Sequence, residues 1–262
     1  MLIVAVVGGV AWFALRHHQP FYNGKGLRSW LETVHMKGMI VPGSEEETAI
    51  RAIGTNALPE LLRMISAKNN TTVWSNMLSR MSLRTRFRYH LLSADDVRWD
   101  GNGGFLVLGA AAKPAVPALI DLLEHDKNID VRRHAAIALQ RIGPGAVEAI
   151  PNFIQHANDP DNVVGCVVLG ALGDVQARPE VVIPFLIGNL TTSQADSSLF
   201  RANTTALAKY GKDAQAAVPV LLRFVNGADE AARKNALNWQ YIEAAKALKA
   251  IDPEAAAKAG VK

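Results

Sequence analysis

The side chains that could carry out catalysis in this 262-residue chain are its seven histidines, its one cysteine and its paired carboxylates. A zinc-hydrolase helix needs two histidines four residues apart with a glutamate beside the first. No two histidines have that spacing, and a single cysteine excludes a cysteine cluster. The sequence also has no Gly-x-Ser-x-Gly turn and no phosphate-binding glycine loop. We therefore expect no enzymatic activity, no metal and no cofactor.

The other residues with chemical potential have structural interpretations. Cys166 lies in an apolar run with no basic neighbour to lower the pKa of its thiol, so we expect a buried structural thiol. Ser44 followed by Glu47 matches a capping box at the start of a helix. The glycine-rich segment 101–104 is expected to be a loop, because it lacks the preceding strand that a dinucleotide site requires.

A short phrase recurs along the chain: an apolar pair ends in a glycine, and a few residues later a proline precedes another apolar stretch. The prolines at 117, 151, 184 and 219 are 34, 33 and 35 residues apart. Glycine closes a helix in the left-handed conformation, and proline fits the first turn of the next helix. The phrase therefore predicts an all-α, right-handed α-solenoid of about five to six helical hairpins, with no strands and with a short hydrophobic helix before it.

The segment 130–144 resembles HEAT repeats, whose phrase is Asp-x-x-Val-Arg-x-x-Ala-Ala-x-Ala-Leu-x-x-Ile-Gly. It reads Asp-Val-Arg-Arg-His-Ala-Ala-Ile-Ala-Leu-Gln-Arg-Ile-Gly-Pro, and a weaker likeness extends over residues 45–255. The resemblance implies an armadillo-like array in which the Asp and Arg of the phrase bridge neighbouring repeats. That structural role falls to Asp130, Arg132 or Arg133, and Arg201. The layout as a whole is similar to uncharacterised bacterial HEAT-repeat proteins with membrane anchors.

Residues Leu2 to Leu15 form an uninterrupted apolar run that ends at Arg16. As a helix this run is about 21 Å long, shorter than the hydrocarbon core of about 30 Å. A cleaved signal peptide remains the alternative, but the run lacks a basic start. We favour a single-pass membrane anchor with the rest of the chain in the cytoplasm. The domains expected are an anchor (1–19), a linker with a capping helix (20–43) and a repeat domain (44–262).

Two sets of residues are candidates for binding a partner. An inserted basic helix at 69–99 carries Arg80, Arg84 and Arg88 on one face, where they either solvate the helix or contact an acidic partner or anionic lipid. The second set is the fourth position after each repeat proline, which we expect to line the concave face: Arg63, Asp121, Gln155, Gly188 and Arg223.

This second set is mixed in charge, and the whole chain has a net charge of only +4. Mixed charge suits a protein or peptide ligand better than a phosphate backbone. The sequence therefore predicts a membrane-tethered, non-enzymatic protein-protein interaction scaffold with no small-molecule substrate. The alternative is a nucleic-acid-binding or DNA-repair array, similar to the HEAT-like alkylpurine DNA glycosylases, that uses the basic residues Arg80–Arg88.

Overall fold

A computed structural model describes residues 19–37, 41–68, 80, 93–192, 197–227 and 239–261. The expected anchor helix lies outside these residues, as do Arg84 and Arg88 in the expected basic helix. Contacts divide the chain into two compact units, Met1–Leu108 (unit 1) and Gly109–Lys262 (unit 2).

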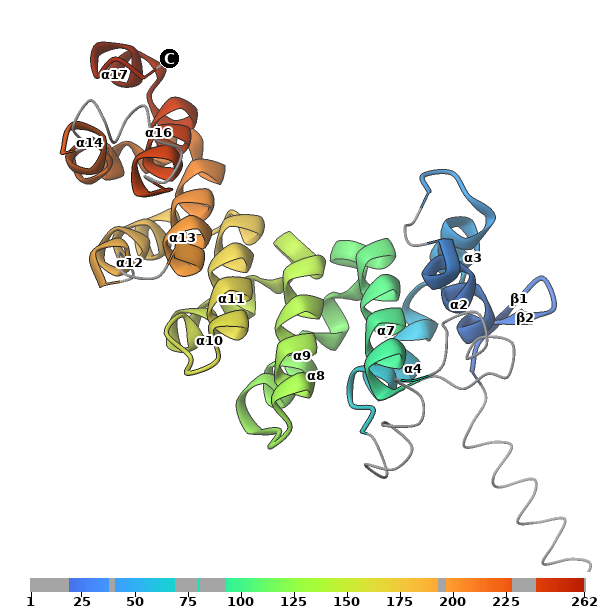
Figure 1. The fold of residues 1–262 in the computed structure, drawn as a ribbon. Coiled ribbons are helices and arrows are strands. Elements are labelled where there is room, and N and C mark those ends of the chain that lie inside the picture. Colours follow the sequence, from blue (N-terminus) through green and yellow to red (C-terminus); the bar gives the residue numbers. More distant parts are fainter. Residues whose placement is uncertain are drawn as a thin grey trace, which may run out of the picture. The chain divides into compact units, whose positions relative to one another are not determined.

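Unit 1 begins with a small antiparallel hairpin of β1 (Phe21–Tyr22) and β2 (Lys25–Gly26), followed by α2 (Leu27–Lys37). The hairpin corrects the prediction of no strands; its turn is possible because Asn23 and Gly24 both adopt positive φ. The other α-helices in the described part of the unit are α3 (Glu45–Ile53), α4 (Leu58–Ile65) and α7 (Ala94–Leu108), shown in blue to green in Figure 1.

The capping box predicted at the start of α3 is confirmed. The Glu47 amide donates to Ser44 Oγ over 3.3 Å, and the Glu47 carboxylate accepts from the Gly43 amide over 2.8 Å. One of the four free N-terminal donors of α3, the Glu47 amide, is thereby satisfied, and the Glu47 carboxylate holds the residue before the N-cap, which together fix where α3 begins.

The glycines of segment 101–104 lie inside α7, so the loop predicted there is wrong. Two of them, Gly101 and Gly104, allow close packing against α4: a Cβ on Gly104 would overlap the buried Leu61 side chain, and one on Gly101 would lie 3.0 Å from Met64 Cβ. The start of α7 at Ala94 falls within the range 69–99 expected for the inserted basic helix.

Unit 2 contains only helices among its described residues. In chain order they are α8 (Val116–His125), α9 (Ile129–Ile142), α10 (Ile150–His156), α11 (Asn162–Val175), α12 (Pro179–Thr192), α13 (Ser197–Lys209), α14 (Val218–Asn226), α16 (Trp239–Ile251) and α17 (Pro253–Lys258) (Figure 1).

The predicted glycine helix ends are confirmed at four places. Gly54, Gly109, Gly143 and Gly211 all have φ between 50° and 60°. Each opens a short 3₁₀ helix that leads into the proline-led helix, a connection that sequence analysis treated as a simple loop. Pro59, Pro117, Pro151 and Pro219 then lie in the first turn of α4, α8, α10 and α14, as the phrase predicted.

Pro184 does not open a helix, which corrects one unit of the predicted pattern. It lies inside α12, whose first residue is Pro179. The reason is that α11 continues past Gly173 and ends at Gln176, which has φ 46°. Gly173 serves helix packing instead, since a Cβ there would lie 2.7 Å from Ala206 Cα in α13.

The helices of unit 2 form two layers. In the first, α9, α11, α13 and α16 pack directly on one another in order. In the second, each proline-led helix packs on the helix that follows it: α8 on α9, α10 on α11, α12 on α13, and α14 on α16. Stacking of this kind, in which each repeat packs on its neighbours, is an all-α solenoid, and that part of the prediction is confirmed.

The apolar content of this core also explains one membrane-like signal. Within the part of the chain that the structure describes, one span, Ala94–His125, is long and apolar enough to cross a membrane by length and composition. It consists of α7, a 3₁₀ helix and α8; α7 packs on α4, and α8 packs on α9. Phe105, Leu119 and Leu123 of this span are buried in that packing, whereas Leu106 is 50% exposed.

Candidate partner-binding surface

The predicted row after the repeat prolines is exposed but lies in the second layer. In unit 2, Asp121, Gln155, Gly188 and Arg223 belong to α8, α10, α12 and α14. These helices pack far less on one another than the first-layer helices do. The row therefore lies in the less closely stacked of the two layers, and its assignment to a concave, partner-binding face stays a prediction.

Two of the predicted binding residues already have partners on their own helix. Arg63, in unit 1, donates two hydrogen bonds to Glu60, over 2.8 Å and 2.5 Å. The Asp121 carboxylate contacts His125 Nδ1 at 3.1 Å. Arg80 is exposed. Within unit 2, the four residues of the row lie on four different helices of the second layer.

The first layer presents a different surface, which we call the inner face. It consists of exposed or half-buried residues spaced three or four positions apart along three neighbouring helices. These residues are Arg133, Ile137 and Arg141 on α9; Val163, Val167 and Gly170 on α11; and Arg201, Thr205 and Lys209 on α13.

The centre of the inner face is apolar. Val163 is 47% exposed, and Val167 and Cys166 are half-buried beside it on α11. Cys166 is therefore more accessible than the buried thiol that the sequence indicated. Cations stand on both sides of this apolar strip, and we call these sides its basic edges. On α9, Arg133 is paired with Asp161; on α13, Lys209 is paired with Asp174, and Arg201 is exposed.

Arg133 holds the α9 edge in place and joins two repeats. Its Nε donates to Asp161 Oδ1 over 2.9 Å, and a second guanidinium nitrogen pairs with the other carboxylate oxygen. Asp161 is the N-cap of α11 and accepts from the Val164 amide. The Arg133 guanidinium is the main cause that lowers the pKa of the Asp161 carboxyl.

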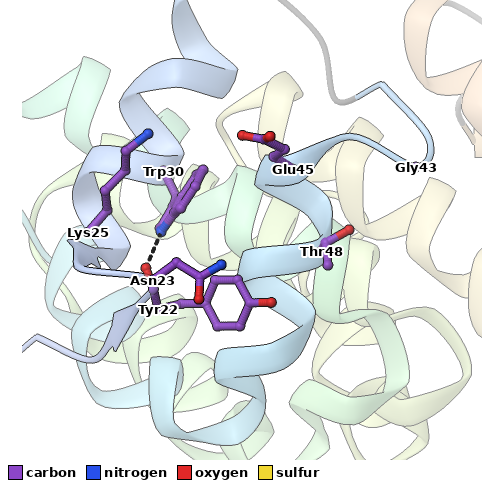
Figure 2. Close-up of a pocket in the computed structure, with 7 residues that line it drawn as sticks. All are labelled: Tyr22, Asn23, Lys25, Trp30, Gly43, Glu45 and Thr48. Carbon is purple, nitrogen blue, oxygen red and sulfur yellow. Dashed lines mark hydrogen bonds between the residues drawn. The ribbon is translucent and has the colours of Figure 1, made fainter.

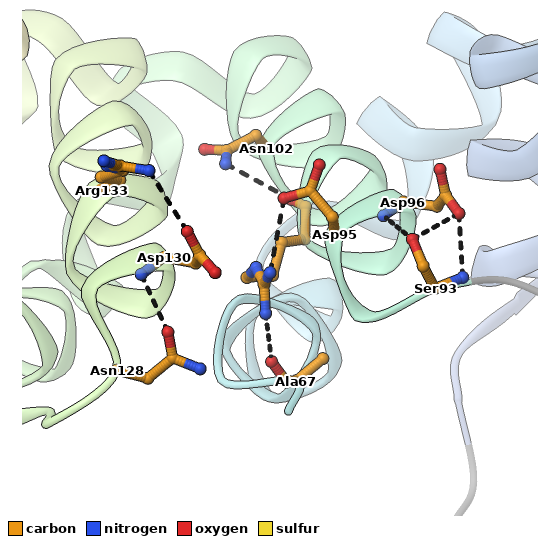
Figure 3. A network of polar contacts seen from close by, with 9 residues as sticks. Ala67, Ser93, Asp95, Asp96, Asn102, Asn128, Asp130 and Arg133 are labelled. Atoms are coloured by element: carbon orange, nitrogen blue, oxygen red, sulfur yellow. Dashed lines mark hydrogen bonds and ion pairs between the residues drawn. The ribbon is translucent and has the colours of Figure 1, made fainter. Parts of the chain in front are cut away.

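The other residues assigned a structural role by resemblance have local contacts. The Asp130 carboxylate accepts from Arg133 over 3.3 Å, and its amide donates to the Asn128 side chain (Figure 3). Arg132 donates to the Asp126 carbonyl over 3.2 Å. Arg201 is exposed on α13.

A second set of inter-repeat contacts, at the other end of the layer, was missed by sequence analysis. The Asp174 carboxylate accepts from Gln140 over 2.9 Å and pairs with Lys209, so it joins α9, α11 and α13. The Tyr210 hydroxyl contacts the carbonyls of Leu172 and Ala177, both at 3.0 Å. Gln140 and Asp174 are 34 residues apart, so a search for polar pairs one repeat apart would have found them.

In unit 1, a buried cation has a structural position between α7 and the end of α4. Arg98 is 2% exposed, and its guanidinium donates to the Ala67 carbonyl over 2.6 Å (Figure 3). Asp95 lies 3.4 Å from the same group. Among the described residues, no group of three or more His, Cys, Asp or Glu side chains could hold a metal ion.

Comparison with known proteins identifies the repeats. Residues 116–208 match the family model of HEAT repeats. The match starts at the first residue of α8 and covers three packed pairs, α8 with α9, α10 with α11, and α12 with α13. No curated protein matches the chain. The HEAT-repeat prediction is confirmed, whereas the likeness to bacterial membrane-anchored proteins stays a prediction.

Proposed function

We propose that this HEAT-repeat protein is a non-enzymatic scaffold that binds a partner protein on the inner face of α9, α11 and α13. HEAT repeats generally mediate protein-protein interaction, which supports a protein partner. The observation that carries the proposal is the exposed apolar strip of α11, with Val163 at its N-terminal end.

The chemistry of the inner face indicates what kind of segment it binds. Apolar contacts along Val163 and Val167 need apolar side chains on the partner, and the basic edges favour acidic residues on either side of them. An amphipathic helix with an apolar stripe between acidic positions meets both requirements. Arg201 is the cation best placed for such a contact, because it is exposed on α13.

The test compares the partner proteins that co-purify with two variants, one changed on the first layer and one changed on the second layer. Val163→Glu with Val167→Glu places two carboxylates on the strip, and Gln155→Glu places one on the exposed surface of α10. Partners recovered with the wild-type chain and with Gln155→Glu should be lost with the double variant, while the helical circular dichroism of all three stays the same. Equal recovery with the double variant would place the partner elsewhere.

We also propose that the run Leu2–Leu15 tethers the scaffold to a membrane with the repeats in the cytoplasm. The support is its apolar sequence and the basic residues that follow it, Arg16, Lys25 and Arg28. A tether would keep the inner face near the membrane surface, where membrane-associated partners are concentrated.

The competing interpretation, a nucleic-acid-binding array, depends on Arg80, Arg84 and Arg88. An exposed apolar strip is a poor match for a phosphate backbone, which favours the protein partner. Binding to duplex DNA that falls steeply with salt, and that Arg84→Ala with Arg88→Ala abolishes, would decide for the nucleic-acid interpretation.

A further inference from the structure

Unit 1 contains a pocket that the proposed scaffold function does not use. Its volume is about 340 Å³, and it lies between the β1–β2 hairpin, α2 and the first turn of α3 (Figure 2). Tyr22 and Trp30 supply aromatic walls, Lys25 and Glu45 supply charges, and Thr48 supplies a hydroxyl. A pocket of this size accommodates a small molecule of a few heavy atoms or one lipid headgroup.

The aromatic walls are fixed by their own contacts. Trp30 is only 5% exposed, and its indole N–H donates to the Tyr22 carbonyl over 3.3 Å. The Tyr22 and Trp30 rings are 6.5 Å apart and tilted by 59°. The hairpin therefore holds both rings in position before any ligand enters.

The positive charge in the pocket is also held in position. Lys25 Nζ lies 4.5 Å from the centroid of the Trp30 ring, a cation-π contact. The other nearby cation, Arg28, is occupied by Glu60 in an ion pair outside the pocket. Lys25 is therefore the cation available to a ligand.

The negative charge of the pocket belongs to Glu45. Of the three glutamates that open α3, Glu46 is buried and Glu47 pairs with Arg51, whereas Glu45 is exposed at the pocket. In the described part of the chain, Glu45 and Lys25 make no ion pair with each other. Figure 2 shows the two charged groups on either side of Trp30.

We propose that this pocket binds a small zwitterion, with the ligand's anionic group on Lys25 and its ammonium group on Glu45. A ligand with one charge would be attracted by one of these side chains and repelled by the other, whereas a zwitterion gains both contacts. The Tyr22 ring adds an attraction for the ammonium group, whereas the Trp30 ring already holds Lys25. An ethanolamine phosphate headgroup and a free amino acid share this chemistry.

Saturation-transfer NMR on the full chain in non-ionic detergent tests the proposal. Glycerophosphoethanolamine and β-alanine are the zwitterionic probes; glycerol 3-phosphate and ethanolamine each carry one of the charges. At least one zwitterion should receive saturation and neither single-charge compound should match it. Transfer only to glycerophosphoethanolamine would identify a lipid-type phosphate source, and transfer only to β-alanine an amino-acid source. No transfer to either zwitterion, or equal transfer to a single-charge compound, would overturn the proposal.

Two variants locate the binding. Lys25→Met and Glu45→Gln each remove one charge and should weaken zwitterion binding about two- to fivefold, the range expected for one exposed ion pair. Lys113→Met and Glu148→Gln are matched controls, because these residues form an exposed ion pair in unit 2. Unchanged binding in both pocket variants, with their helical circular dichroism intact, would place the ligand outside this pocket.

Discussion

Gly173 tests the packing of the first layer most sharply. An added Cβ at this position would lie 2.7 Å from Ala206 Cα and 3.1 Å from Lys209 Cδ, and the backbone of α13 cannot rotate away as a side chain can. Overpacking of this kind costs about 1–3 kcal/mol. Alanine is also a better helix former than glycine, by about 1 kcal/mol. Gly173→Ala should therefore lower the free energy of unfolding by about 0–2 kcal/mol.

Gly188 is the matched control in the same unit. It lies inside α12, is exposed, and has no atom within 4 Å of where its Cβ would be. Gly188→Ala should keep the propensity gain without the clash, so the two variants should differ by about 1–3 kcal/mol.

Urea unfolding of the full chain, followed by circular dichroism, measures the difference between these two variants. An array of repeats can unfold in stages, so midpoints of the same transition are compared. If Gly173→Ala is as stable as Gly188→Ala, then α11 and α13 are not in close contact at this position, and the layer described here is incorrect.

Three further predictions concern single residues and the N-terminal run. Asp161→Asn keeps an N-cap for α11 but loses the ion pair with Arg133, whereas Asp161→Ala loses both. Loss of the cap alone costs about 1 kcal/mol, so Asp161→Asn should be more stable than Asp161→Ala. The urea midpoints of the two variants measure this difference. The pKa of Asp161 is lowered in the folded state, so its contribution to the free energy of unfolding is present above the ordinary pKa of about 3.9 and is lost as pH falls through the folded pKa. The Asp161→Asn variant should not show this loss of stability in acid. Burial raises the pKa of Tyr210 to about 12, so the contribution of Tyr210 to the free energy of unfolding is complete below about pH 10 and is lost as pH rises through the folded pKa. The difference in tyrosinate absorbance between the wild type and Tyr210→Phe should therefore rise only near that pKa. Tyr210→Phe should also lower the free energy of unfolding by about 1–2 kcal/mol, because the carbonyls of Leu172 and Ala177 lose the hydroxyl that they share as a donor. Deleting Leu2–Leu15 should move the protein from the carbonate-resistant membrane fraction to the supernatant; an unchanged distribution would refute the tether.

Helix boundaries could be predicted from the sequence where a glycine serves only to end a helix and a proline only to begin one. Gly143 and Gly211 end helices at a positive φ, which favours glycine, and the prolines that follow fit a first turn. The rule failed where the same residue types serve packing. Positions 173 and 104 need glycine because a neighbouring helix packs too closely there for a larger side chain. Sequence alone does not distinguish a glycine that ends a helix from a glycine that allows two helices to pack closely.

The candidate site was less predictable than the fold. The period gives the order of the helices, but not which of the two layers is more closely stacked, so the layer that holds the row through Asp121 and Gln155 became known only from the structure. The role of Arg133 followed from resemblance to a known repeat. Its partner Asp161 is 28 residues away, and only the packing of α9 on α11 brings the two together.

The most direct measurement of the central claim is site-specific photo-crosslinking in cells. A photoreactive amino acid at Val167, on the inner face, should form a covalent adduct with the partner protein. The same amino acid at Gln155, exposed on α10, should not form that adduct. Adducts from position 155 but not from position 167 would contradict the claim that the α9, α11 and α13 layer is the recognition surface.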